Sequence, residues 1–365
     1  MNSGQLHLEK GAPNSLDYAR LAVMVVKREM RVMMCRGLRV QMKSNWFRGL
    51  VTCVFLFNAL GASADYRDHP NAAALIERVT AKGVDREWLE GALTEATKQE
   101  SILKAISRPA EKSKPWSKYQ DIFLTERRTK EGIKFWRENR EALDRVSAET
   151  GVPSEIIVAI IGVETYYGRI TGGYRVIDAL TTLAFDYPRR SSFFTKELEV
   201  FLVLAYESGL PLTDMKGSYA GAMGLGQFMP SSYTAYAKDF EGDGIIDIWT
   251  NPNDAVMSVA NYFVAHGWRP GGDVIAAADF TGEVSVFEGG LKPKKTIAEL
   301  SDLGLTSSDK APTSAKATPI KFEGKAGDEY WLGLHNFYVI TRYNHSAMYA
   351  MAVYQLSQDL RAQML

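Results

Sequence analysis

The stretch with the clearest chemical potential runs from Pro153 to Gly168, PSEIIVAIIGVETYYG. Its apolar centre predicts a buried helix, and Ser154 is expected to cap its start. Ile157, Ile160 and Ile161 precede Glu164 by seven, four and three residues, which places the Glu164 carboxyl group on an apolar helix face. Burial raises the pKa of a carboxyl group, and a carboxylic acid that is neutral near pH 7 can act as a general acid.

A structural role for Glu164 is the alternative. Arg169 and Arg175 follow the predicted helix closely enough to form an ion pair with its carboxylate. A second carboxylate could share the chemistry with Glu164. Asp178 and Asp186 are the nearest in sequence, and we expect structural roles for both.

A second chemical motif begins at Asp239 and resembles an EF-hand calcium loop. Its predicted ligands are the side chains at positions one, three and five and the carbonyl oxygen at position seven: Asp239, Glu241, Asp243 and Ile245. Gly244 stands at position six, as the motif requires, but position twelve is Thr250 instead of glutamate. The sequence favours a structural calcium site over a plain acidic turn.

Two further segments carry candidate binding residues. The segment KGSYAGAMGLGQFMPSSY, residues 216–233, is rich in glycine, which lets the backbone approach a ligand closely. Gln227 lies there among apolar neighbours and is a candidate hydrogen-bonding residue, and Ser231 or Ser232 is expected to cap the next helix. Arg189 and Arg190 suit an anionic ligand group or a solvated surface equally well.

The composition limits the class of protein. The chain has 365 residues with 43 basic and 43 acidic side chains, so it lacks the net positive charge that favours nucleic acid as a main partner. A hydrophobic fraction of 46% is enough for a large core, and the length predicts two or three lobes.

The first 64 residues are interpreted as an upstream extension followed by a signal peptide. Met42 is the expected start, Lys43 and Arg48 form a basic region, and Gly49–Leu60 is an apolar run too short to span a bilayer. Ala62-Ser63-Ala64 offers a cleavage site. An uncleaved anchor is the alternative.

Both cysteines, Cys35 and Cys53, lie upstream of the predicted cleavage site. The mature protein would therefore contain no disulfide, no cysteine nucleophile and no thiolate metal site. Lipidation at Cys53 is disfavoured, because Thr52 is large for the preceding position and most of the apolar run follows the cysteine.

The remaining chain is divided by its hydrophobic spacing and by its glycine and proline content. Amphipathic segments predict a helical domain over 65–150, with Lys112–Lys118 as a polar connector and Phe123–Ala148 as one or two charged helices. A catalytic core over 151–269 contains the loop 239–254. Short β-prone runs, including Val284–Phe287, predict a small β domain over 270–335, and 336–365 returns to the core.

Five motifs in order resemble the lytic murein transglycosylase B family: GVETYYG, FDYPRRSSFF, KGSYAGAMGLGQFMPSSY, ANYFVAHGW and ITRYNHSAMYAMAVYQL. The resemblance covers the chain from about Asp65 onward. It implies a mainly α fold of the α+β type: a lysozyme-like helical core, an added helical domain and a small inserted antiparallel β domain.

The resemblance also implies residue roles. Glu164 would be the sole catalytic acid/base, and Asp254 would complete the calcium loop. The positions that match substrate-binding residues are Ser218, Gln227, Arg190, Tyr262, Tyr343, Asn344, Tyr349 and, less closely, Tyr119, with Arg189 beside them. The family cleaves peptidoglycan between N-acetylmuramic acid and N-acetylglucosamine and leaves a 1,6-anhydro ring.

These features predict a monomeric enzyme in the periplasm, with association with the outer membrane as an additional possibility. The predicted enzyme needs no cofactor for catalysis. Its predicted binding partners are peptidoglycan glycan strands and proteins that synthesise or remodel the cell wall. The alternatives are a hydrolytic muramidase of the same fold, a non-catalytic glycan-binding protein and a calcium sensor. A lone calcium loop without a second hand argues against the sensor.

Overall fold

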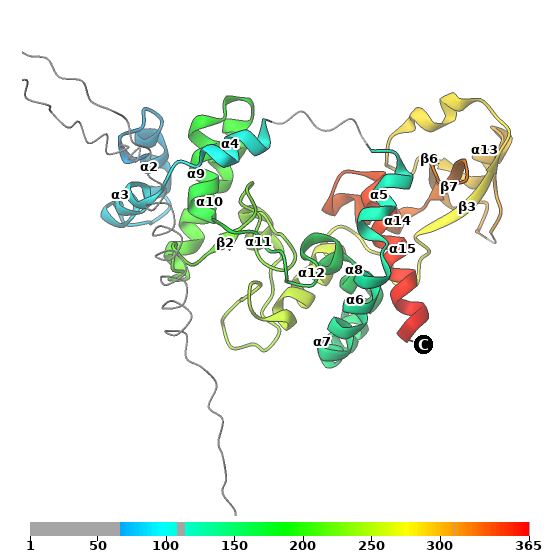
Figure 1. Ribbon diagram of the computed structural model, residues 1–365, viewed down its shortest axis with the longest axis horizontal. Helices are drawn as coiled ribbons and strands as arrows, with labels where there is room; N and C mark the ends of the chain where they lie inside the picture. Colours follow the sequence, from blue (N-terminus) through cyan, green and yellow to red (C-terminus); the bar gives the residue numbers. More distant parts are fainter. Residues whose placement is uncertain (1–65, 108–113, 310, 365) are drawn as a thin grey trace, which may run out of the picture. The chain divides into compact units, whose positions relative to one another are not determined.

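The computed structural model describes residues 66–107, 114–309 and 311–364 (Figure 1). The predicted signal peptide, the start at Met42 and both cysteines lie outside these residues. Most of the described chain is helical, and a small antiparallel sheet lies in its C-terminal third. The prediction of a mainly α fold with a small antiparallel β domain is confirmed.

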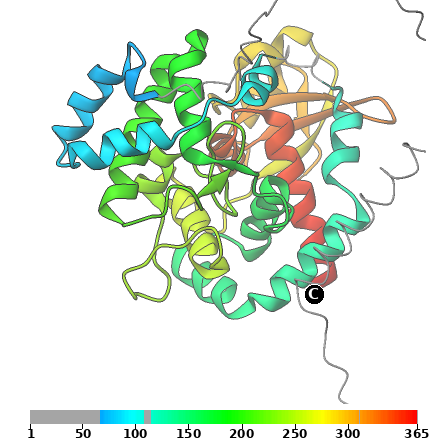
Figure 2. The same cartoon turned by 60° about the vertical axis from the view of Figure 1, so that its left-hand side comes forward.

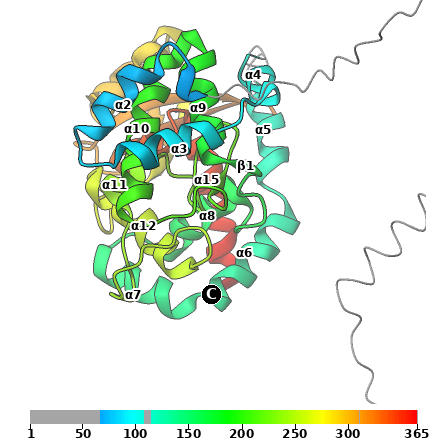
Figure 3. The ribbon, with the colours of Figure 1, turned by 90° about the vertical axis from the view of Figure 1, so that its left-hand side faces the viewer.

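The first helices form a short amphipathic group. They are η1 (Tyr66–Asp68), α2 (Ala72–Thr80), α3 (Arg86–Glu95) and α4 (Glu100–Ile106). The Asp85 side chain caps α3 by accepting from the Trp88 N–H at 2.8 Å. Helix α2 packs against α10 and α4 packs against α9, which places this group beside the core helices (Figure 3).

A second group is α5 (Trp116–Phe123), α6 (Glu126–Glu138) and α7 (Arg140–Thr150). Helix α5 occupies part of the predicted polar connector, and the long charged segment is two helices joined at Asn139. The apolar stripe of α6 and α7 is buried as predicted, because it packs against α8, α12 and α15. The division at residue 150 remains a prediction.

The central helices are α8 (Ser154–Thr165), α9 (Val176–Asp186), η2 (Pro188–Arg190), α10 (Ser191–Glu207), α11 (Pro230–Tyr236), α12 (Pro252–Ala265), α14 (His335–Tyr343) and α15 (Ala347–Met364). Residues 156–163 of α8 are all buried, as its apolar sequence predicts. In Figure 2 the red helix α15 lies among the teal helices α5 and α6, and α8 packs against it.

Two predicted helix caps are wrong. The N-cap residue of α8 is Pro153, and no side chain caps the helix start. Ser154, the predicted cap, lies inside the helix, and its hydroxyl donates to the Leu143 carbonyl at 3.1 Å. Helix α11 begins at Pro230, since proline needs no N–H partner at that position. Ser231 bonds to the buried Glu197 carboxylate through both its N–H and its hydroxyl, so it ties α11 to α10.

The small domain is built on a five-stranded antiparallel sheet of order β4-β6-β7-β3-β5. Its elements are β3 (Ile275–Phe280), η3 (Val284–Gly289), β4 (Lys295–Thr296), α13 (Ile297–Asp302), β5 (Leu305–Ser307), β6 (Lys316–Glu323) and β7 (Asp328–Gly333). The β-prone run Val284–Phe287 is a 3₁₀ helix, contrary to expectation. Leu300, Leu305 and Leu332 form a separate core under this sheet.

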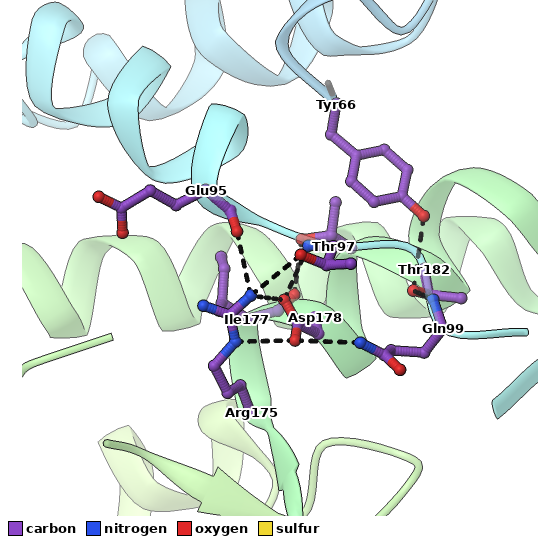
Figure 4. Close-up of polar contacts among 9 residues, drawn as sticks. Tyr66, Glu95, Thr97, Gln99, Arg175, Ile177, Asp178 and Thr182 are labelled. Carbon is purple, nitrogen blue, oxygen red and sulfur yellow. Dashed lines mark hydrogen bonds and ion pairs between the residues drawn. The ribbon is translucent and has the colours of Figure 1, made fainter. Parts of the chain in front are cut away.

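The short strands β1 (Tyr174–Arg175) and β2 (Lys216–Gly217) pair in antiparallel fashion beside α9. Arg175 begins a polar network that joins the N-terminal helices to α9 (Figure 4). Its guanidinium donates to the Asp178 carboxylate at 2.6 and 2.8 Å, and to the Glu95 carbonyl at 3.0 Å. The same carboxylate accepts from the Thr97 N–H at 2.8 Å and from the Gln99 side chain at 3.4 Å.

Asp186 also joins the N-terminal segment to α9. It accepts from the Tyr66 hydroxyl at 2.6 Å and pairs with Lys98 at 3.2 Å. Both aspartates therefore have structural partners, as expected from the sequence.

Within the described residues, no single helix is long and apolar enough to cross a membrane. Helices α7 and α8 together meet the length and composition criteria, but the chain bends by 117° between them.

Candidate active site

Glu164 lies in the last turn of α8, where buried helix gives way to a sharp turn. Tyr166 and Tyr167 follow with φ angles of 53° and 60°, left-handed values that are uncommon for residues other than glycine. This conformation ends the helix, and it costs free energy that the surrounding contacts must offset. The Glu164 side chain is only half-buried, so a substrate oxygen can reach it.

Tyr349 contacts the Glu164 carboxyl group directly. Its hydroxyl, on α15, donates to Glu164 Oε1 at 2.6 Å. Burial, followed by the Glu164 charge, raises the pKa of Tyr349 well above its usual value. The hydroxyl therefore keeps its proton and remains a hydrogen-bond donor to Glu164.

Burial raises the pKa of Glu164 to about 7, and the Tyr349 hydrogen bond opposes this rise. The structural alternative fails, because the two arginines have other partners: Arg169 pairs with Glu131, and Arg175 pairs with Asp178. In the part of the chain that the structure describes, no basic side chain forms an ion pair with Glu164. Its carboxyl group can thus hold a proton near neutral pH.

A pH-dependent loss of stability follows. Unfolding returns the pKa of Glu164 from about 7 to 4.5, so the native state binds the proton more tightly. This group lowers the free energy of unfolding as pH rises from 4.5 to 7, by at most about 3 kcal/mol. We expect Glu164→Gln to match wild type near pH 4 and to be more stable at pH 8. Urea unfolding at both pH values measures this, and an equal difference at the two values would contradict it.

Three predicted tyrosines form a cluster beside Glu164. The Tyr343 hydroxyl donates to the Gly226 carbonyl at 2.6 Å, and the Tyr262 hydroxyl donates to the Arg342 carbonyl at 2.6 Å. The ring centroids of Tyr262 and Tyr343 are 4.7 Å apart. Burial, followed by the Glu164 charge, raises the pKa of Tyr343 well above its usual value, as it does for Tyr349. Tyr262 and Tyr343 use their hydroxyl groups on backbone carbonyls, so they position the surrounding loops.

Gln227 and Ser218 lie in the glycine-rich loop. Gln227 has a φ angle of 54°, and its side-chain amide donates to the Thr171 and Gly224 carbonyls, both at 3.0 Å. Its Oε1 atom accepts no bond from the described residues and is open to a ligand donor. The Ser218 hydroxyl accepts from the Ala222 N–H at 3.0 Å. The loop therefore fixes both side chains before a ligand binds.

The other predicted binding residues have fewer described contacts with the site around Glu164. Tyr119 is half-buried on α5, where the Glu164 charge adds to the effect of burial in raising its pKa. Arg189, Arg190 and Asn344 are exposed. The Arg190 guanidinium lies 4.3 Å from the Phe193 ring centroid. Among the described residues, no hydrogen bond or ion pair joins these three side chains to Glu164.

Two residues that sequence reasoning missed hold this site together. Arg128, on α6, donates to the Gly162 carbonyl, and its guanidinium lies 4.7 Å from the Tyr166 ring centroid. The buried Thr165 hydroxyl donates to the Leu225 carbonyl at 2.9 Å and so joins α8 to the glycine-rich loop. Arg128 sits in a strongly charged helix, and no local pattern distinguishes it from its solvated neighbours.

Three of the five predicted calcium ligands converge. Single carboxylate oxygens of Asp239, Glu241 and Asp254 lie within 4.8 Å of one another. Asp254 is fully buried, and burial raises its pKa while N–H groups of Phe240 and Asp247 oppose that rise. Hard oxygen ligands of this kind, without a described ion-pair partner, fit Ca²⁺.

The remaining two predicted ligands lie outside this convergent group. The Asp243 carboxylate accepts from the Ile245 N–H at 2.8 Å, and Ile245 itself is exposed.

A half-buried glutamic acid with a raised pKa, carried by a helical core, is an arrangement that general acid catalysis can use. Comparison with known proteins identifies the class of enzyme. Residues 67–358 match the transglycosylase SLT domain family. The membrane-bound lytic murein transglycosylase B of Escherichia coli K12 is 44% identical over 311 residues, which cover 82% of this chain and 85% of that protein.

Two solved structures are similar in fold. Escherichia coli lytic transglycosylase Slt35 in complex with calcium has a TM-score of 0.75 and 43% identity, covering 82% of this chain and 95% of that one. Pseudomonas aeruginosa SltB3 in complex with NAG-anhNAM-pentapeptide has a TM-score of 0.72 and 31% identity, covering 79% and 78%.

The chain belongs to the transglycosylase SLT domain family. It is an enzyme of the lytic murein transglycosylase type, a lyase that acts on peptidoglycan.

Proposed function

We propose that the enzyme cleaves the β-1,4 bond between N-acetylmuramic acid and N-acetylglucosamine, with Glu164 as sole acid and base. The observation that carries the proposal is the pKa of about 7 at a half-buried carboxyl group held by Tyr349. The complex of SltB3 with NAG-anhNAM-pentapeptide supports the product.

The proposed reaction has two proton transfers. Glu164 first donates its proton to the glycosidic oxygen, and the N-acetylglucosamine side leaves as an alcohol. The Glu164 carboxylate then accepts the proton of the muramyl 6-hydroxyl group, whose oxygen bonds to the anomeric carbon. This step closes the 1,6-anhydro ring, restores the acid and consumes no water.

The substrate-binding residues would act around this centre. We assign binding of sugar and acetamido groups to Gln227, Ser218, Asn344 and Tyr119, and contact with anionic groups to Arg189 and Arg190. Tyr262, Tyr343 and Tyr349 would orient the loops and the acid, since their hydroxyl groups already have acceptors.

Cleavage in water enriched in ¹⁸O tests the reaction. We expect products that end in an anhydro ring, one water lighter than a reducing end and free of label. Mass spectrometry of fragments from purified glycan strands measures both properties. Label at the new terminus would identify a hydrolytic muramidase, and absence of cleavage would favour a non-catalytic binding protein.

We also propose that Ca²⁺ binds the loop 239–254 through Asp239, Glu241 and Asp254, with Asp243 and the Ile245 carbonyl as further ligands. The ion would be structural, because the loop joins α11 to α12. The calcium complex of Slt35 supports this assignment.

Calcium is therefore expected to raise the melting temperature, since it binds the native and not the unfolded state. At a hundredfold excess over Kd the gain is about 2.7 kcal/mol. Calorimetry with calcium and with a chelator measures the shift in wild type and in Asp239→Asn. Asp279→Asn, an exposed aspartate in the β domain, is the control. Equal shifts in all three proteins would refute the site.

The proposed location is the periplasm, on the sequence of residues 43–64 and on the name of the membrane-bound Escherichia coli relative. Peptidoglycan glycan strands are the proposed partner, and the proposed state is a monomer. N-terminal sequencing of the mature protein checks the cleavage after Ala64, and a cytoplasmic protein that begins at Met1 would contradict it.

A further inference from the structure

A cavity lies between the helical core and the β domain. It has a volume of about 630 Å³, which is within the usual range for ligand sites. Its walls come from the segment after α12, the N-terminal end of α14 and the segments beside β4 and β6. Neither Glu164 nor any of the predicted substrate-binding residues lines it.

Positive charge dominates this cavity. Arg269, Lys292 and Lys316 line it, with Asp273 as the one carboxylate among its described lining residues. None of the three cations forms an ion pair with a described carboxylate. The whole chain is neutral by formal charge, so this is a local excess. Cations without protein partners in a concave site attract an anionic ligand.

A buried asparagine fixes one wall of the cavity. Asn336, 1% exposed, accepts from the Arg269 N–H at 2.9 Å and donates to the Arg269 and Gly272 carbonyls at 2.9 and 2.8 Å. The loop that carries Arg269 is thereby held in place without a ligand, which reduces the entropy lost on binding.

Part of the remaining lining is apolar. Pro293, Pro312, Ala315 and Leu334 contribute it. A site that combines three cations with small apolar surfaces fits a short peptide with free carboxylates and small side chains better than it fits an uncharged sugar.

We propose that this cavity binds the carboxylate-bearing peptide of peptidoglycan. The proposal rests on the proposed function, and the SltB3 complex contains a NAG-anhNAM-pentapeptide, a glycan fragment that carries a peptide. The cavity and Tyr343 lie at opposite ends of α14, whose nine residues span about 12 Å. An extended pentapeptide reaches roughly 17 Å. A peptide on a sugar bound beside Tyr343 is therefore long enough to span α14 and reach the cavity.

Titration calorimetry with a synthetic N-acetylated pentapeptide that carries at least two carboxylates tests the proposal. We expect wild type to bind it, and Lys292→Glu and Arg269→Glu to bind at least tenfold more weakly. Lys294→Glu is the matched control, because Lys294 is exposed, lies two residues from Lys292 and does not line the cavity. It should bind like wild type.

Two further probes identify the source of the negative charge. The same peptide with its carboxylates esterified should not bind. If inorganic phosphate binds with the same sensitivity to Lys292→Glu while the peptide does not bind, the cavity is a phosphate site and the proposal is wrong. Equal binding of the peptide to wild type and to Lys292→Glu also refutes it.

Activity separates this proposal from the proposed function. Lys292→Glu should cleave peptide-free glycan strands at the wild-type rate and show a higher KM for strands that carry peptides. An equal KM on both substrates would overturn the cavity's role and leave the proposed reaction intact. Failure of wild type to cleave peptide-free strands would instead count against the proposed function.

Discussion

Replacement of Glu164 by Gln is expected to lower kcat for glycan cleavage by a factor of about ten thousand or more. Glutamine keeps the shape of the side chain but can neither donate a proton to the glycosidic oxygen nor accept one from the 6-hydroxyl group. Both steps of the proposed reaction depend on the same carboxyl group. The described contacts of Glu164 include no second carboxylate that could replace it.

Measurement of kcat and of glycan affinity separates chemistry from binding. Affinity should survive in Glu164→Gln, because Gln227 and Ser218 are held by backbone contacts that the substitution does not touch. Glu155→Gln, at the first turn of the same helix, is the control and should retain wild-type activity. Substantial turnover by Glu164→Gln would exclude Glu164 from the reaction.

Replacement of Asp178 by Ala should lower the free energy of unfolding by about 3–5 kcal/mol, the usual effect of breaking a buried ion pair. Asp178 is 4% exposed and accepts four hydrogen bonds. Alanine removes these acceptors from the Arg175 guanidinium and the Thr97 N–H (Figure 4). Because these bonds join the N-terminal helices to α9, that junction should weaken most.

Urea unfolding with hydrogen exchange measures both effects. Asp144→Ala removes an exposed pair with Arg140 and should cost no more than about 1 kcal/mol. Asp178→Asn keeps part of the hydrogen bonding, and below its melting range it should cleave glycan at the wild-type rate. Loss of activity in a folded Asp178→Asn protein would indicate a second catalytic carboxylate.

The fold was predictable from the sequence where hydrophobic spacing was strong. The continuous apolar run of α8 and the buried stripe of α6 and α7 correspond to helices in the structure. Prediction was weakest in the β domain. The β-prone run Val284–Phe287 is a 3₁₀ helix. Whether such a run becomes a strand depends on its pairing with other strands, and local propensity does not encode that pairing.

For the candidate site, the apolar spacing around Glu164 was sufficient to predict that burial raises the pKa of its carboxyl group, although the side chain is only half-buried. The partners could not be predicted from spacing. Tyr349 reaches Glu164 from a helix that begins at Ala347, and Arg128 reaches Gly162 from α6. Both contacts are long-range, so they depend on how the helices pack.

The hydrogen bond between Tyr349 and Glu164 joins residues 185 positions apart in the chain. A polypeptide still emerging from the ribosome contains Glu164 before α15 has been synthesised and has packed against α8. Until α15 packs against α8, the burial that raises the pKa of Glu164 is incomplete. We therefore expect wall-cutting activity only after the chain has folded through α15, which would make turnover a reporter of complete folding.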